Sequence, residues 1–214
     1  MSDEVNRRRY DATGRRERAR QTRLEVLAVA KDLFVQRGYS ATKMSDVAAA
    51  AGVSVELLYS AFGSKPALLK TVFDVTIAGD DTPVPVMDRP EMHAVRAEPD
   101  PVRALRLYAR FVAQTASRAY PVHLVVLTAA SSDPVVAGIA GDLSAQRLHG
   151  MTMFAAKLAS SGRLAVSEAE ARDLLWTLNS AQVYDLLVLQ RGWPLDSYER
   201  LLGDTWTSAL LSHD

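Results

Sequence analysis

Hydrophobic residues recur at intervals of three and four along most of the chain, the spacing that places them on one side of an α-helix. No stretch alternates hydrophobic and polar residues over the length of a strand. The pattern therefore predicts an all-α protein, with one helix starting at Pro121 and others over 22–37, 42–51, 54–62, 64–73, 101–119, 133–161, 167–191 and 196–210.

Residues 42–65, TKMSDVAAAAGVSVELLYSAFGSK, predict two short helices joined by a tight turn. Gly52 lies where the first helix must end and the chain reverse, a position that often needs a positive φ. Ser54 is expected to cap the second helix, and Leu58 and Phe62 give that helix one apolar stripe. This spacing is typical of a helix-turn-helix, in which the second helix can enter the major groove of DNA.

The composition along the chain divides it into three regions. Residues 1–21 are rich in arginine and poor in apolar residues, which predicts a disordered basic arm. Residues 22–66 are expected to form an N-terminal three-helix helix-turn-helix DNA-binding domain that opens on a capping box at Thr22. Residues 67–214 are expected to form a C-terminal helical domain. Within it, the prolines of 79–101 predict a connecting loop with at most one short helical turn.

Several kinds of chemistry are excluded by composition. The absence of cysteine rules out disulfides, thiolate metal sites and cysteine nucleophiles. No phosphate-binding glycine loop, dinucleotide motif or nucleophile elbow occurs, so we expect no cofactor, no catalytic residues and no enzymatic activity. We also expect no metal site, because the histidines lack metal-ligand spacing: His93, His123, His149 and His213.

No apolar run reaches the roughly 18 residues of a membrane span, and the N-terminus lacks the apolar core of a signal peptide. We therefore expect a cytoplasmic protein. Its net charge of +0 hides an asymmetry, because residues 1–70 hold 13 Lys/Arg against 8 Asp/Glu, whereas residues 71–214 hold 12 against 17. A basic front half fits a polyanion-binding domain, and chance placement of surface charge is the alternative.

An ordered array of features extends across residues 24–69. An apolar helix ends in Phe34-x-x-x-Gly38-Tyr39. It is followed by Asp46-Val47-Ala48-x-x-Ala51-Gly52-Val53-Ser54, and then by Leu58-Tyr59-x-x-Phe62-Gly63-Ser64-Lys65. In its order and spacing the array resembles the TetR family of transcriptional regulators. The resemblance implies a homodimer whose last two helices form a four-helix interface, a palindromic double-stranded DNA operator, and repression relieved by a small-molecule effector.

Carried over by position, the resemblance makes Tyr59 and Lys65 phosphate contacts, with Thr42 and Lys43 also touching the DNA backbone. The alternative interpretation of Tyr59 is an aromatic residue of the hydrophobic core. The outer face of the second helix holds no Arg, Lys, Asn or Gln, the residues that make the common bidentate contacts to bases. The predicted DNA-binding residues are Thr42, Lys43, Ser54, Val55, Glu56, Leu57, Tyr59, Ser60 and Lys65.

Because that face is poor in base-reading groups, we hypothesise that the basic arm adds affinity beside each half-site, in the minor groove or on the backbone. A solubilising tail is the alternative. The C-terminal domain carries polar groups at helical spacing on an apolar helix, together with aromatic residues on other helices. A pocket for a mostly apolar ligand would be lined by Tyr108, Phe111, His123, Met151, Phe154, Trp176, Asn179 and Tyr184. For each of these residues, core or interface packing is the alternative.

The sequence thus favours a ligand-responsive DNA-binding transcriptional regulator that represses as a homodimer and is released by a small, mostly apolar molecule. One alternative is a ligand-independent DNA-binding protein whose C-terminal domain only dimerises. An activator is a second alternative, and an enzyme with a helical catalytic body is a third.

Overall fold

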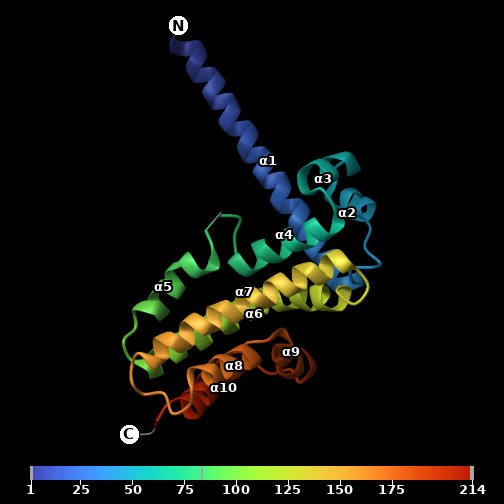
Figure 1. The fold of residues 1–214 in the computed structure, drawn as a ribbon. Coiled ribbons are helices and arrows are strands. Elements are labelled where there is room, and N and C mark those ends of the chain that lie inside the picture. Colours follow the sequence, from blue (N-terminus) through green and yellow to red (C-terminus); the bar gives the residue numbers. More distant parts are fainter. Residues whose placement is uncertain (1, 83, 213–214) are drawn as a thin grey trace. The chain divides into compact units, whose positions relative to one another are not determined.

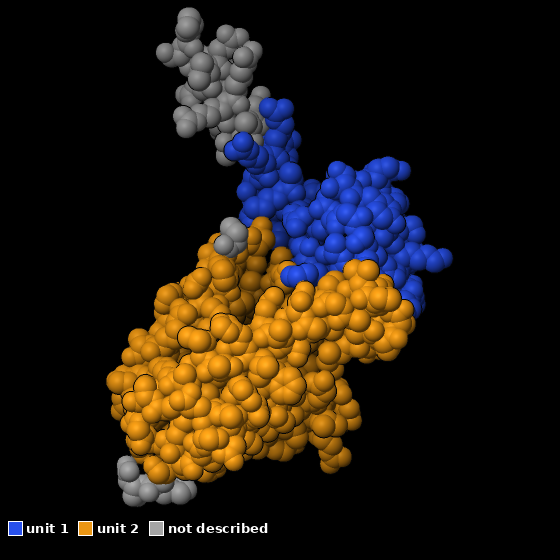
Figure 2. Space-filling view, in the orientation of Figure 1, with its two compact units in different colours: residues 1–72 blue, residues 73–214 orange. Residues whose placement is uncertain are grey.

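The computed structural model describes residues 2–82 and 84–212, with side chains from Gly14 onward. The chain forms two compact units, residues 1–72 and 73–214 (Figure 2). The division lies inside helix α4 (Lys65–Ala78), later than the boundary expected after residue 66. The reason is that the first turns of α4, which carry the buried Leu68 and Leu69, group with unit 1. No helix of the described residues is long and apolar enough to cross a membrane.

Unit 1 contains α1 (Ser2–Arg37), α2 (Met44–Ala51), α3 (Val55–Phe62) and the start of α4 (Figure 1). Helix α2 packs against both α1 and α3. The small core of unit 1 buries Leu58 and Phe62, the predicted apolar stripe of α3, together with Leu27, Leu33, Phe34, Met44, Val47 and Ala48.

The turn between α2 and α3 has the predicted geometry. Gly52 ends α2 with φ 66°. This left-handed conformation is more favourable for glycine than for residues that carry a side chain. The Ser54 hydroxyl accepts a hydrogen bond from the Leu57 amide at 3.1 Å and so caps α3. The cap of α2 is Lys43 rather than Thr42, and the Lys43 amide donates to the Asp46 carboxylate at 3.0 Å.

Helix α1 begins at Ser2, which corrects two expectations: a disordered arm over 1–21 and a helix start at Thr22. Arginine is the commonest residue in this stretch, and it has high helix propensity. Side chains also support the helix locally, since Arg20 pairs with Glu17 at 2.9 Å and the Arg18 Nε donates to the Gly14 carbonyl at 3.2 Å. The side chains of Arg7, Arg8 and Arg9 lie outside the described residues.

Unit 2 is also wholly helical, apart from one isolated bridge between Leu164 and Leu211 among its described residues. Its elements are the C-terminal end of α4, η1 (Val86–Asp88), α5 (Pro90–Ala97), α6 (Pro101–Ala129), α7 (Pro134–Ala159), α8 (Glu168–Leu178), α9 (Ala181–Tyr184), η2 (Asp185–Gln190) and α10 (Leu195–Leu210).

Helix α6 is the centre of unit 2, because α5, α7, α9 and α10 all pack against it (Figure 1). It runs unbroken through Pro121, where the sequence predicted the start of a new helix. Proline removes one intrahelical hydrogen bond. Buried side chains on both sides of it, Tyr120 and Val122 among them, hold the helix in place by tertiary packing. The opposing face of α10 buries Tyr198, Leu202, Trp206 and Leu210 completely.

The helix expected over 167–191 is interrupted at Asn179 and Ser180. Ser167 and Glu170 form the predicted capping box of α8, whose C-terminal cap is Asn179. The Ser180 hydroxyl then accepts from the Val183 amide at 3.3 Å and starts α9, which continues as the π-helix η2. The helix is therefore interrupted where two adjacent polar side chains, those of Asn179 and Ser180, can form hydrogen bonds that compete with those of the helix backbone.

The region expected to be a loop, 79–101, contains the two-turn helix α5. Pro90 occupies its first turn, and Met92 and Val95 bury one face of it. Before α5, Arg89 binds the Asp80 carboxylate with both terminal nitrogens at 2.7 and 2.9 Å. These hydrogen bonds lower the pKa of Asp80 well below its usual range.

Candidate functional site

Helix α3 presents the surface that the sequence assigned to DNA. Glu56 and Ser60 are exposed, Val55 is half-buried, and Leu57 and Tyr59 are 48% and 51% exposed. Tyr59 is therefore not the core aromatic of the alternative interpretation. Hydrogen bonds at the start of α3, from its backbone and from Ser54, lower the pKa of Glu56, so this face carries a negative charge at neutral pH.

Two of the predicted phosphate contacts have different surroundings. Thr42 is 1% exposed, and its hydroxyl donates to the carbonyls of Gly38 and Leu33 at 2.8 and 3.2 Å. The hydroxyl thus caps the end of α1 and is not exposed to a ligand, whereas the contact of residue 42 with the DNA backbone stays a prediction. Lys65 is half-buried, with its Nζ 4.0 Å from the centre of the Tyr39 ring.

Unit 1 places one further cation near α3 that the sequence did not single out. The guanidinium of Arg23, on α1, lies 4.6 Å from the centre of the Phe62 ring, and its Nη1 donates to the Ala61 carbonyl at 3.5 Å. Positive charge therefore borders the C-terminal end of α3, although the face of α3 itself holds none. The sequence could not reveal this contact, because Arg23 and Ala61 are far apart in the chain and meet only in the folded structure.

A cavity of about 920 Å³ lies within unit 2. The residues predicted to line a pocket divide into two groups. Six of them line the cavity: Tyr108, Phe111, His123, Met151, Phe154 and Asn179. Trp176 and Tyr184 are not among the lining residues. The Tyr184 ring packs edge-on against Tyr120 and Tyr198, with ring centres 5.5 Å apart in both pairs.

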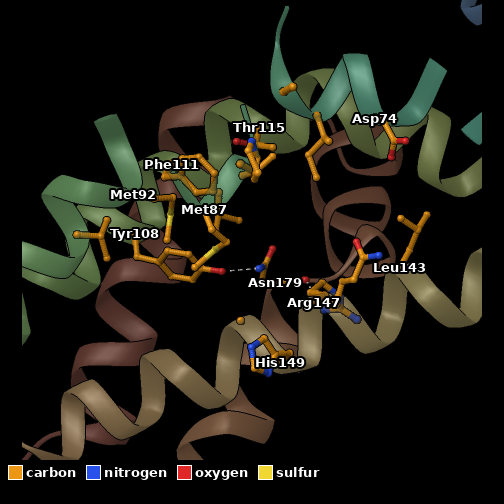
Figure 3. Close-up of a pocket in the computed structure, with 18 of the residues that line it drawn as sticks. Asp74, Met87, Met92, Tyr108, Phe111, Thr115, Leu143, Arg147, His149 and Asn179 are labelled. Carbon is orange, nitrogen blue, oxygen red and sulfur yellow. Dashed lines mark hydrogen bonds between the residues drawn. The ribbon is translucent and has the colours of Figure 1, made fainter. Parts of the chain in front are cut away.

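The polar groups of the cavity meet at Asn179. Its Nδ2 donates to the Tyr108 hydroxyl at 2.8 Å (Figure 3), and its Oδ1 accepts from the Tyr120 hydroxyl. Tyr108 in turn donates to the Met151 sulfur at 3.4 Å. Burial raises the pKa of both tyrosines, so their hydroxyls are neutral donors and acceptors at neutral pH.

The residue that sequence reasoning missed is Arg147, on α7. Its guanidinium lies 4.4 Å from the centre of the Trp176 ring, and its Nη1 donates to the backbone carbonyls of Trp176 and Asn179. Trp176 therefore supports the cavity wall from behind Arg147. A helical-face argument could not find this pair, because the break at Asn179 is what turns those carbonyls toward α7.

The remaining lining is largely apolar and includes Val95, with Met87, Met92 and Phe111 at one end of the cavity (Figure 3). His123 lies on the wall between Phe73 and Tyr120, with ring centres at 5.3 and 6.1 Å. Burial, and to a smaller extent the charge of Arg147, lower the pKa of His123 to about 4. No group of three acidic or histidine side chains suited to a metal ion occurs among the residues described, and His213 lies outside them.

A helix-turn-helix unit followed by a helical unit with an internal cavity defines the class: a DNA-binding transcriptional regulator. Residues 26–72 match the family described as bacterial regulatory proteins, tetR family. The match covers the helix-turn-helix unit and confirms the resemblance of that part of the chain to the family of transcriptional regulators. None of the curated proteins compared with the chain matches it in sequence.

Solved structures share the fold over nearly the whole chain. NalD, the secondary repressor of the MexAB-OprM multidrug efflux pump in Pseudomonas aeruginosa, is 19% identical with a TM-score of 0.70, over 92% of this chain and 100% of that one. A protein from Saccharomonospora viridis, described as a transcriptional regulator and solved in complex with choline, is 19% identical. Its TM-score is 0.68, over 90% of this chain and 99% of that one. These likenesses extend the family's fold to unit 2.

The depressed pKa of His123 predicts acid sensitivity of unit 2. The ring is neutral in the folded state down to about pH 4, whereas the unfolded chain takes up its proton near 6.5, so stability is lost as the pH falls between these values. In urea unfolding followed by circular dichroism, the His123→Gln variant should lose about 2–3 kcal/mol less than the wild type between pH 7 and pH 4.5. Equal losses in the two proteins would contradict this assignment.

Proposed function

We propose that the chain is a repressor that binds a palindromic operator as a homodimer and is released from it by a small, mostly apolar molecule. The observation that carries the proposal is the combination of a tetR-family helix-turn-helix with an exposed α3 and a large, mainly apolar cavity in unit 2. A cavity of about 920 Å³ is at the large end of the range for small-molecule sites, about 300–1,000 Å³. A domain that served only for dimerisation would have no use for such a volume.

The solved relatives support both halves of the proposal. NalD is a repressor of an efflux pump, and the Saccharomonospora protein was solved with a small molecule, choline. In the mechanism we propose, the dimer exists in operator-competent and operator-incompetent states, and the effector binds the second more tightly. The shift between the two states, and with it the release from the operator, is then limited by the difference between the effector's affinities for them.

The surface of unit 2 supports dimerisation through α7 and the segment from α8 to Trp193. Exposed apolar side chains on that segment are Leu174, Leu186, Leu189 and Trp193. One face of α7 carries exposed, mostly small residues at helical spacing, which allow close helix approach: Gly138, Gly141, Ala145, Leu148, Thr152 and Ala156. The resemblance pointed to the last two helices, but the exposed residues of α10 are mainly polar, such as Asp196, Arg200 and Asp204.

The DNA-binding half is tested by selecting an operator from random duplexes and measuring its affinity by fluorescence anisotropy at several salt concentrations. Replacing the exposed Lys43 by Gln should weaken binding and reduce the salt slope by about one unit per protomer, because one phosphate contact is lost. Arg200→Gln, an exposed change in unit 2, is the matched control and should leave the slope unchanged. A chain that selects no operator would contradict the proposal.

The basic part of α1 is tested by deletion. Removing residues 2–20 deletes seven arginines but keeps the buried side chains of α1, which start at Val26. We expect operator binding to weaken more than about tenfold, since each lost phosphate contact removes favourable counterion release. A variant with the same arginines replaced by lysines separates charge from arginine-specific contacts. Unchanged affinity after deletion would favour a solubilising role for this segment.

The dimer surface is tested with the double variant Leu186→Glu and Leu189→Glu, both on η2. If these leucines meet a second copy of the chain, the four buried carboxylates should shift the protein to monomers in light scattering after gel filtration. The control is Ser208→Glu on the exposed side of α10. A dimer that survives the double substitution would place the interface elsewhere.

A further inference from the structure

The cavity of unit 2 contains a guanidinium that no carboxylate neutralises. Arg147 forms no ion pair among the described residues, and the other charged side chains on the cavity lining are Asp74, Asp80, Asp81, Arg96 and Lys157. Asp80 is engaged by Arg89 outside the Arg147 network. The side chains that interact electrostatically with Arg147 are Tyr108, Tyr120, Tyr198 and His123, and no carboxylate is among them. An arginine stays protonated in such surroundings, so its charge remains in the cavity wall.

The hydrogen-bonding groups around Arg147 already satisfy one another. Tyr120 donates to Asn179, Asn179 donates to Tyr108, and Tyr108 donates to Met151. The carbonyls of Trp176 and Asn179 occupy only the Nη1 atom of Arg147. The protein side of the cavity therefore offers Arg147 no further acceptor.

Two nitrogens of the guanidinium are left with hydrogens to donate. The Nε atom is buried without a hydrogen-bond partner, and Nη2 has none among the described residues. A buried donor without an acceptor costs about 1–3 kcal/mol, and more when it is charged. The cavity thus has a surplus of donors beside Asn179, at the position where Figure 3 shows Arg147 and Tyr108 on either side of that residue.

The rest of the cavity suits an apolar body. Met87, Met92, Phe111 and Phe154 line it together with Val95, and flexible methionines adapt to ligands of different shape. The hydroxyl of Thr115, buried without a hydrogen-bond partner in the described structure, is one further polar group on this lining. A ligand that matches the whole cavity therefore has a long apolar part and one anionic group at an end.

We propose that Arg147 anchors a ligand site for an apolar monocarboxylate, whose carboxylate accepts from the Nη2 atom of the guanidinium while its hydrocarbon part lies among Met87, Met92, Phe111 and Phe154. This deepens the proposed function, on which it rests for the ligand's regulatory role. The planar guanidinium matches a carboxylate in geometry and charge, and charge-assisted hydrogen bonds of this kind are about twice as strong as neutral ones. A quaternary ammonium would instead meet the same charge as its own.

The test compares three ten-carbon probes in isothermal titration calorimetry with the full chain and no DNA: decanoate, decan-1-ol and decyltrimethylammonium. Decanoate should bind at least about tenfold more tightly than decan-1-ol, the factor expected for a charge-assisted hydrogen bond. Decyltrimethylammonium should bind most weakly. The proposal is overturned if decanoate does not bind, if the alcohol binds equally well, or if the ammonium binds tightest.

Substitution of the anchor then separates charge from shape. Arg147→Met should remove the preference for decanoate over decan-1-ol. The affinity for the alcohol should stay within about threefold of the wild-type value, because methionine replaces the apolar part of the arginine side chain. The control Arg103→Met removes an exposed arginine of α6 that does not line the cavity, and should preserve the preference. A preference that persists in Arg147→Met overturns the assignment. If that variant does not fold, Arg147→Lys replaces it and should keep only part of the preference.

The same probes distinguish failure of this inference from failure of the proposed function. Decanoate that binds with the predicted preference but does not release the protein from its operator supports the site and contradicts its regulatory role. If the protein binds its operator but shows no preference for decanoate, the proposed DNA-binding function stands and the proposed carboxylate site is wrong.

Discussion

The buried amide of Asn179 is the contact on which the architecture of unit 2 depends. It ends α8, bonds two tyrosines of α6 through its side chain, and presents its carbonyl to Arg147 of α7. A buried amide that lost these partners would carry the full cost of desolvation, so the network fixes the relative positions of three helices. The polar wall of the cavity follows from that single residue.

This arrangement also explains why an arginine can lie in a largely apolar wall. The ring of Trp176 and two backbone carbonyls compensate part of the desolvation cost, but they leave the positive charge unneutralised. Burial, and to a smaller extent the same charge, keep His123 neutral at neutral pH. Arg147 therefore carries a positive charge in the part of the cavity wall where the histidine and the tyrosines are neutral.

Sequence reasoning was most successful where structure is determined by neighbours in the chain. Gly52 favours the turn and Ser54 favours a helix start whatever the rest of the fold does, so the bounds of the helix-turn-helix could be predicted closely. It failed where tertiary contacts override a local rule. Thr42 has the chemistry of a helix cap but donates to the end of α1, and Pro121 has the chemistry of a helix start but lies inside α6. The length of α1 was missed for a different reason, because arginine-rich composition was weighed above helix propensity.

The cavity shows the same division. Six of its lining residues could be chosen because aromatic and polar side chains at helical spacing favour a pocket, and those residues lie on continuous helices or at a helix end. Trp176 was chosen for the wrong role, and Arg147 was overlooked, because their pairing depends on the interruption at Asn179. A periodic pattern cannot reveal which residue turns a backbone carbonyl out of its helix.

The recognition surface leads to a last consequence for regulation. Leu57 and Glu56 on α3 offer only apolar contact and one acceptor to the bases, whereas the cations lie beside α3 or on α1. Affinity for DNA should then be largely electrostatic, and the margin between operator and other sequences modest. When that margin is small, an effector needs to contribute only the usual coupling of about 1–3 kcal/mol to redistribute the protein away from its operator. In the proposed switch, a weakly base-reading helix and a cavity with an unneutralised arginine are therefore compatible, because neither requires the other to supply a large free energy.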